Sequence, residues 1–277
     1  MMLLEIEDLR VTFHTAKGDV EAVRGVSFAL DRGERLGVVG ESGSGKSQTG
    51  RAILGLTDRR ATVTARRLAF DGQELTALRP RARARLRGAR ISMILQDPKY
   101  SLNPVMTVGR QIAEAIRAHH RVSRAEATRR MHAMLEDVHI RDPERVARAN
   151  PHELSGGMGQ RVMIAMMMAP EPALVIADEP TSALDVTVSL QVLAVLDDLI
   201  RRRGTGLLFI SHDLPLVASY CDRVVIMYAG RVVETCAAEA LAQATHPYTR
   251  GLLGCLPRVD ARLERLPVLD RDPAWAA

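Results

Sequence analysis

Gly40-Glu41-Ser42-Gly43-Ser44-Gly45-Lys46-Ser47 is the stretch of this sequence that says most about its fold. The apolar residues 36–39 before it predict a buried strand, and residues 49–56 after it predict a helix. Glycines allow a loop to wrap phosphates with its backbone N–H groups, Lys46 can reach the β- and γ-phosphates, and the Ser47 hydroxyl can ligate Mg²⁺. A glycine- and serine-rich turn with an incidental lysine would have the same composition. The strand before it and the helix after it favour a phosphate-binding loop.

Other short apolar runs predict the sheet to which this loop belongs. They cover residues 91–95, 174–177, 207–210 and 224–227. Runs that are apolar on both faces are typical of a buried parallel sheet. Upstream, apolar residues spaced mostly by two between Leu4 and Phe13, and again between Val23 and Leu30, predict an antiparallel sheet at the start of the domain.

The region between residues 97 and 172 is helical in character. Ser123 with Glu126 forms a capping-box pattern, and an apolar stripe at helical spacing follows it. A later helix ends at Arg201-Arg202-Arg203-Gly204, with cations at its carbonyl end and glycine as its stop signal. The sequence therefore predicts an α/β fold with a mixed central sheet, an antiparallel N-terminal part and a helical insert.

Composition limits the remaining choices. A chain of 277 residues, 47% hydrophobic and 26% charged, makes one large domain or two small ones. No stretch approaches the roughly 20 apolar residues that a membrane-spanning helix needs. The acidic start of the chain argues against a secretory signal. The cysteines, Cys221, Cys236 and Cys255, match no metal spacing and make no disulfide framework, so we expect a reducing compartment.

The net charge of +5 comes mostly from arginine, since only Lys17, Lys46 and Lys99 of the 38 basic residues are lysines. Residues 79–90 are dense enough in arginine to suggest a nucleic-acid-binding arm. A solvated helix face, or a general preference for arginine, explains the same pattern. We favour these explanations because no aromatic residues interleave to stack on bases.

Two adjacent acids, Asp178 and Glu179, follow the apolar residues 173–177. On an extended backbone they point to opposite sides of the chain, at the carboxyl edge of the sheet where α/β proteins bind ligands. Asp178 can then hold Mg²⁺ through water, and Glu179 can polarise a water that attacks the γ-phosphate. Alone, such a pair is often only a helix-start signal. The phosphate-binding loop favours the functional interpretation.

A second anion-binding pattern, Leu154-Ser155-Gly156-Gly157-Met158-Gly159-Gln160-Arg161, places a serine and two glycines at a predicted helix N-terminus. With it the sequence resembles the ATP-binding-cassette (ABC) ATPases, P-loop NTPases whose signature is Leu-Ser-Gly-Gly-Gln. Met158 stands where the family has its glutamine. The resemblance implies that Ser155, Gly156 and Gly157 cap the nucleotide held by the phosphate loop of a partner cassette.

Four further positions resemble the family's motifs. Gln96 matches the glutamine that senses Mg²⁺ and the attacking water, although alone it would be a surface residue. Asp185, in Ser182-Ala183-Leu184-Asp185, matches the loop that touches the opposite subunit, although alone this stretch would be an N-cap with a first-turn acid. His212 matches the switch histidine that contacts the γ-phosphate and positions Glu179; a lone histidine is ordinarily structural or exposed. Phe13 resembles the aromatic that stacks on adenine, and a core strand residue is the equal alternative.

The resemblance implies ATP and Mg²⁺ as cofactors. The implied catalytic residues are Glu179, His212, Gln96 and Lys46. The implied ATP-binding residues are Phe13, Gly40, Glu41, Ser42, Gly43, Ser44, Gly45, Lys46, Ser47, Gln96, Asp178, Glu179 and His212. The residues implied to contact ATP across a dimer interface are Ser155, Gly156, Gly157 and Asp185. The implied Mg²⁺ ligands are Ser47, Gln96 and Asp178.

Two segments, residues 94–104 and 246–253, resemble the ATPases of dipeptide, oligopeptide and nickel importers. This resemblance implies a cassette over residues 1–250, with a helical insert at about 97–172, and a C-terminal tail over 251–277. It implies ATP hydrolysis coupled to uptake of a peptide, nickel or a related small solute. Some relatives bind an iron–sulfur cluster in a longer tail; Cys255 has no companion after it, so we expect none here.

The implied partners are a second ABC ATPase, identical or different, two transmembrane permease subunits and an extracytoplasmic solute-binding protein. The implied location is peripheral, at the cytoplasmic face of the cell (inner) membrane, without direct nucleic-acid binding. The alternative is a soluble ABC-type ATPase of DNA repair or chromosome maintenance. Such proteins separate the two motifs by long coiled coils, whereas about a hundred residues intervene here. A binding module without catalysis would not need both Glu179 and His212.

Overall fold

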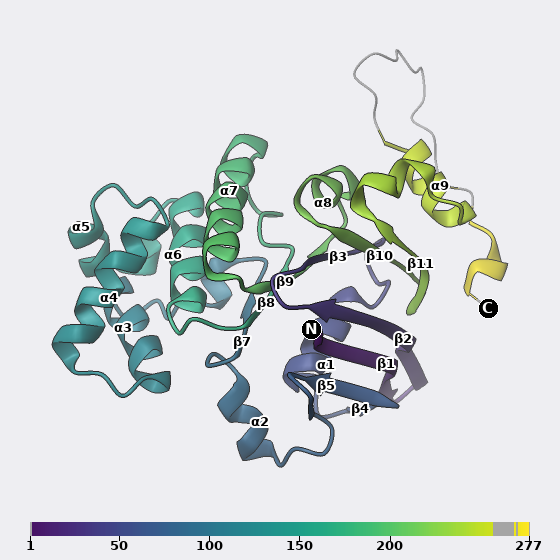
Figure 1. Ribbon diagram of the computed structural model, residues 1–277, viewed down its shortest axis with the longest axis horizontal. Coiled ribbons are helices and arrows are strands. Elements are labelled where there is room, and N and C mark those ends of the chain that lie inside the picture. Colours follow the sequence, from purple (N-terminus) through teal and green to yellow (C-terminus); the bar gives the residue numbers. More distant parts are fainter. Residues whose placement is uncertain (1, 257–268, 270, 277) are drawn as a thin grey trace. The chain divides into compact units, whose positions relative to one another are not determined.

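The computed structural model describes residues 2–256, 269 and 271–276 (Figure 1). The chain divides into two compact units. The first unit comprises residues 1–77 and 209–277, and the second comprises residues 78–208. Strand β9 (Gly206–Ser211) runs across the boundary between these segments. No helix among the described residues has the length and apolar character to cross a membrane.

An antiparallel sheet opens the first unit, as the period-two pattern predicts. Strand β1 (Met2–Thr15) pairs with β2 (Gly18–Asp31), with Ile6 opposite Phe28 and Val11 opposite Val23. Leu4, Ile6 and Val11 are buried, which sets the register, because a one-residue slip would turn them to the other face. The sheet is completed by β4 (Ala61–Thr64), β5 (Arg67–Phe70) and β6 (Gln73–Glu74).

A mixed group of strands carries the phosphate-binding loop. Strand β3 (Arg35–Val39) is parallel to β10 (Arg223–Tyr228), which is antiparallel to β11 (Arg231–Ala237). The helix predicted from residue 49 begins earlier: α1 spans Lys46–Leu54, because Gly45 with φ 100° turns the chain directly into it. The unit also contains α8 (Leu214–Tyr220), η3 (Ala238–Gln243), α9 (Pro247–Gly254) and η4 (Pro273–Ala276).

The second unit contains two fully buried parallel strands and a group of helices. Strand β7 (Ile91–Ile94) pairs with β8 (Leu174–Asp178) in parallel. The helices between them confirm the helical character predicted for this region. They are α3 (Val108–His119), α4 (Arg124–Asp137), α5 (Pro143–Arg148) and α6 (Gly156–Met168), with short turns η1 (Pro98–Tyr100) and η2 (Pro151–Glu153). After β8, α7 (Val186–Arg203) ends at Gly204 in the left-handed conformation, as predicted.

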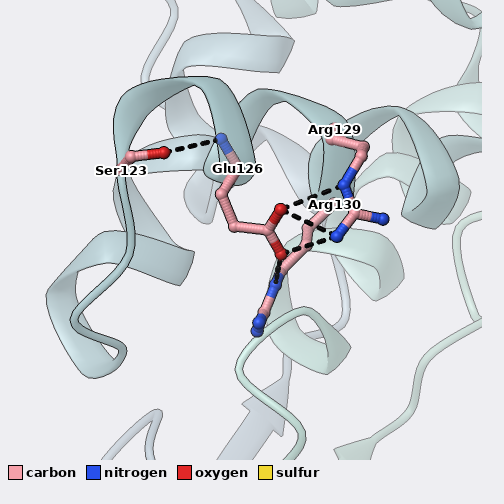
Figure 2. Close-up of polar contacts among 4 residues, drawn as sticks. All are labelled: Ser123, Glu126, Arg129 and Arg130. Carbon is pink, nitrogen blue, oxygen red and sulfur yellow. Dashed lines mark hydrogen bonds and ion pairs between the residues drawn. The ribbon is translucent and has the colours of Figure 1, made fainter.

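The start of α4 shows how local charge alters a predicted cap. The Ser123 hydroxyl accepts the N–H of Glu126 at 3.1 Å (Figure 2). The Glu126 carboxylate, however, accepts bonds from the side chains of Arg129 and Arg130, so ion pairs replace the return bond of a full capping box. Hydrogen bonds from Arg130, and then Arg129, lower the pKa of Glu126.

The arginine-rich stretch forms a short helix, α2 (Pro80–Leu86). None of the residues of this helix, all of which the structure describes, is buried. This exposure is consistent with a solvated helix face, and the role of the arginine-rich stretch stays a prediction. The predicted domain boundaries stay predictions, and most of the predicted tail, at residues 257–268, 270 and 277, lies outside the described residues.

Candidate nucleotide-binding site

The phosphate-binding loop lies so close to neighbouring backbone that two of its glycines are required. A Cβ at Gly40 would collide with the carbonyl oxygen of Met227. A Cβ at Gly45, where φ is +100°, would lie 2.5 Å from the carbonyl oxygen of Ala22. Ser42 and Gly43, at the tip, are exposed. The loop is therefore a fixed cradle with an accessible tip, which fits the phosphate groups of a nucleotide.

Lys46 supplies the buried positive charge of this cradle. It is the first residue of α1 and is 5% exposed. Its Nζ donates hydrogen bonds to the carbonyl oxygens of Gly40 at 2.7 Å and Glu41 at 2.8 Å. A buried ammonium requires such acceptors, and phosphate oxygens can replace them. Ser47, the next residue, is half-buried at the helix N-terminus, where backbone N–H groups favour an anion.

His212 lies directly after β9, in a turn whose two flanking residues are joined by a hydrogen bond. Ser211 is buried, and its hydroxyl accepts the N–H of Asp213 at 3.0 Å. Asp213 caps α8 by accepting the N–H of Leu216 at 2.9 Å. The turn is thus fixed on both sides of His212, whose side chain is exposed. This placement agrees with a residue that meets a ligand beyond a strand end.

Phe13 lies on β1 opposite Val20 of β2 and Ala61 of β4. Its side chain is half-buried, whereas Val11, two residues earlier, is fully buried. Phe13 is therefore less buried than the core positions of its strand, and its stacking on adenine stays a prediction.

In the second unit, Gln96 and the two acids follow paired parallel strands. Ile94 of β7 is opposite Ala177 of β8, so the residues after both strands lie at the same edge. Asp178 is 7% exposed, Glu179 is half-buried and Gln96 is exposed. Carboxylate and amide oxygens at one edge are ligands that Mg²⁺ accepts.

Glu179 departs from the geometry assumed for two alternating acids. Its φ is 48°, in the left-handed region that residues other than glycine rarely adopt, and β8 ends at Asp178. Its carbonyl oxygen accepts bonds from the N–H and the hydroxyl of Ser182 at 3.3 and 3.2 Å. Because the strand does not extend through Glu179, strand alternation does not determine where its carboxylate points.

The second anion-binding pattern packs against the start of α7. Ser155 is the N-cap of α6, and its hydroxyl accepts the N–H of Met158 at 3.4 Å. A Cβ on Gly157 would lie 2.5 Å from a methyl of Val188, so glycine is required there. Asp185 caps α7 by accepting the N–H of Val188 at 3.0 Å. The structure therefore brings Ser155, Gly156 and Gly157 beside the turn that carries Asp185, and Met158 contributes its backbone to this cap.

Gln160 is a candidate positioning residue that the sequence analysis missed. It is 1% exposed in α6, and its Nε2 donates a short hydrogen bond to the carbonyl oxygen of Pro180. It therefore ties the helix that follows Ser155 to the residue after Glu179. Its helical spacing to the buried residues Met163 and Ile164 was the available signal, because a glutamine on an apolar helix face needs a buried partner.

Comparisons with known proteins show the family to which this chain belongs. A family model described as ABC transporter matches residues 23–182. The probable peptide ABC transporter ATP-binding protein y4tR of Sinorhizobium fredii is 50% identical over 269 residues, covering 96% of this chain and 80% of that protein. The oligopeptide transport ATP-binding protein OppD of Escherichia coli is 46% identical over 272 residues, covering 98% of this chain and 80% of that protein.

Among solved structures, the dimeric structure of MJ0796, a bacterial ABC transporter cassette, matches with a TM-score of 0.76 and 25% identity, covering 85% of this chain and 99% of that one. These similarities confirm the predicted fold and family. They give no support to the nucleic-acid alternative, since all three proteins are described as ABC transporter components or transport proteins. The chain belongs to the ABC transporter family and is one of its ATP-binding cassettes.

Proposed function

We propose that this chain is the ATP-hydrolysing subunit of a peptide importer. The observation that carries the proposal is similarity over nearly the whole chain to ATP-binding proteins described as peptide and oligopeptide transporters. The same similarity favours peptide over nickel as the solute. The importer would comprise a second ABC ATPase, identical or different, two permease subunits and an extracytoplasmic binding protein. The cassettes would act at the cytoplasmic face of the cell membrane.

The residues of the loop fit the triphosphate of ATP. The backbone N–H groups of residues 42–47 and Nζ of Lys46 would hold the phosphates, and the half-buried Phe13 would stack on the adenine. Ser47, Asp178 and Gln96 offer the oxygen ligands that suit Mg²⁺, which neutralises phosphate charge when it is bound. The proposal gives each group a role consistent with its burial.

Hydrolysis would depend on two further residues of this chain. Glu179 would accept a proton from the attacking water, and His212 would contact the γ-phosphate. Ser155, Gly156, Gly157 and Asp185 would serve the nucleotide of the partner cassette. Exposure of Ser155, Gly156 and Asp185 supports that role, since a partner can reach them.

The decisive experiment measures ATP hydrolysis by the chain alone and in vesicles with its permease subunits and the peptide-loaded binding protein. We expect hydrolysis to rise when the complex is complete and peptide is present, and to be absent in K46A. Nickel or duplex DNA should not replace the peptide. Stimulation of the isolated chain by DNA would contradict the proposal, and stimulation by nickel alone would change its substrate.

A further inference from the structure

Glu41, the second residue of the phosphate-binding loop, forms hydrogen bonds through its N–H, its carbonyl oxygen and its carboxylate. Its carbonyl oxygen accepts bonds from Nζ of Lys46 at 2.8 Å and from the N–H of Ser44 at 3.2 Å. Its N–H donates to the hydroxyl of Tyr248 at 3.2 Å. Its carboxylate accepts a bond from Arg271 at 2.7 Å. Two of these partners, Tyr248 and Arg271, lie more than 200 residues later in the sequence.

Tyr248 is suited to position the loop because its side chain is packed against other aromatic rings. It is fully buried, and its ring lies 4.5 Å from that of Tyr228 and 5.9 Å from that of Trp275, centroid to centroid. Burial raises the pKa of its hydroxyl to about 12, so the group stays neutral at physiological pH. A neutral hydroxyl can accept the N–H of Glu41 without repelling the nearby carboxylate.

The start of α9, which carries Tyr248, is anchored to β11. The Glu234 carboxylate accepts the N–H groups of Thr245 at 2.7 Å and His246 at 3.3 Å. His246 in turn caps the helix by accepting the N–H of Tyr248 at 3.2 Å. The hydroxyl that meets Glu41 is therefore fixed by backbone contacts on both sides of Pro247.

We propose that Tyr248 and Arg271 are positioning residues of the nucleotide site. By holding Glu41 they keep the loop, and through its carbonyl oxygen also Lys46, in the conformation that receives phosphate. Tyr248 and Arg271 thereby set the affinity for ATP without contacting the nucleotide. This inference rests on the proposed function, because it concerns ATP binding by the same loop.

The test measures the Kd of a fluorescent ATP analogue, together with KM and kcat for ATP, in the full chain. In Y248F the ring remains and only the hydroxyl is lost, so we expect Kd to rise about two- to tenfold, the range of one hydrogen bond. In R271Q an exposed ion pair is lost, so we expect a rise of about two- to fivefold, and R271K should restore most of it. In both variants KM should rise while kcat stays near the wild-type value.

Matched controls separate loop positioning from general stability. Y228F removes a hydroxyl from the same ring cluster, and R250Q removes an exposed arginine of α9; both should bind ATP as the wild type does. Because Arg271 acts through Glu41, R271Q should add no effect in an E41Q background. Thermal unfolding of each variant identifies any that are misfolded, and R271Q, at an exposed residue, keeps the test valid if Y248F unfolds.

Three results would overturn the inference: wild-type ATP affinity in both Y248F and R271Q, a fall in kcat with unchanged KM, or an equal loss in Y228F. A wild-type chain that fails to bind ATP would overturn the proposed function as well. Normal wild-type binding with unaffected variants would overturn the positioning role alone.

Discussion

Glu179 shows at the residue scale that a candidate site residue can be proposed from its position in the sequence although its backbone conformation cannot. The sequence places it directly after a buried strand, which is enough to suggest its chemistry. Its left-handed φ of 48° depends on the turn closed by Ser182, which no strand pattern predicts. The same limit explains why Arg271 was missed: its partner, Glu41, is remote in sequence, so no periodicity connects them.

Replacing Glu179 by glutamine tests its role as base. The amide keeps the size and the hydrogen-bonding reach of the side chain but cannot accept a proton, so we expect ATP binding to persist while kcat falls at least about 100-fold. E171Q is a matched control, because Glu171 is exposed and also has a positive φ, 58°. Steady-state hydrolysis and nucleotide binding measure the two effects; near-native kcat in E179Q would exclude Glu179 as the base.

At the scale of elements, α6 connects the two turns of the second unit that carry candidate site residues. Its N-terminus carries Ser155 and Gly157, which pack beside the start of α7. Three residues after Gly157, the side chain of Gln160 donates a hydrogen bond to the carbonyl oxygen of Pro180, next to Glu179. A shift of α6 would therefore move both turns together.

Replacing Gln160 by leucine should break this connection. The change leaves the Pro180 carbonyl without its side-chain donor in a buried place, which costs about 1–3 kcal/mol of the free energy of unfolding. Q243L, at an exposed glutamine of η3, is the control and should change stability by less than about 0.5 kcal/mol. Urea unfolding measures both, and equal stability of Q160L and the wild type would show that the bond contributes nothing.

Most elements could be predicted because their signals are local. The apolar runs predicted each end of β7, β8, β9 and β10 to within one residue. The arginine-rich end with glycine predicted the stop of α7. The start of α1 was misplaced by three residues, from 49 to 46, because Lys46, Ser47 and Gln48 are polar and add nothing to an apolar helical pattern. Their helical conformation there follows from the left-handed Gly45, which is a tertiary requirement of the cradle.

At the scale of the whole molecule, we propose that the chain carries halves of two nucleotide sites, each of which is completed only when two cassettes pair. The first is the phosphate-binding loop around Lys46, and the second is the exposed Ser155 turn. A pair of cassettes related by two-fold symmetry would match each loop with the other subunit's turn. A variant without a working loop would then lose the site that its own loop forms, and a variant without a working Ser155 turn would lose the site formed with its partner's loop.

Mixing two inactive variants tests this arrangement directly. K46A destroys the loop half, and S155R blocks the turn half with a large charged side chain at an exposed position. Each variant alone should lack hydrolysis. In an equal mixture half of the dimers are mixed, and each of these keeps one intact composite site, so about a quarter of wild-type activity should return. Circular dichroism would confirm that both variants are folded. Folded variants that regain no activity on mixing would show that two copies of this chain do not form composite sites, leaving a different cassette as the required partner.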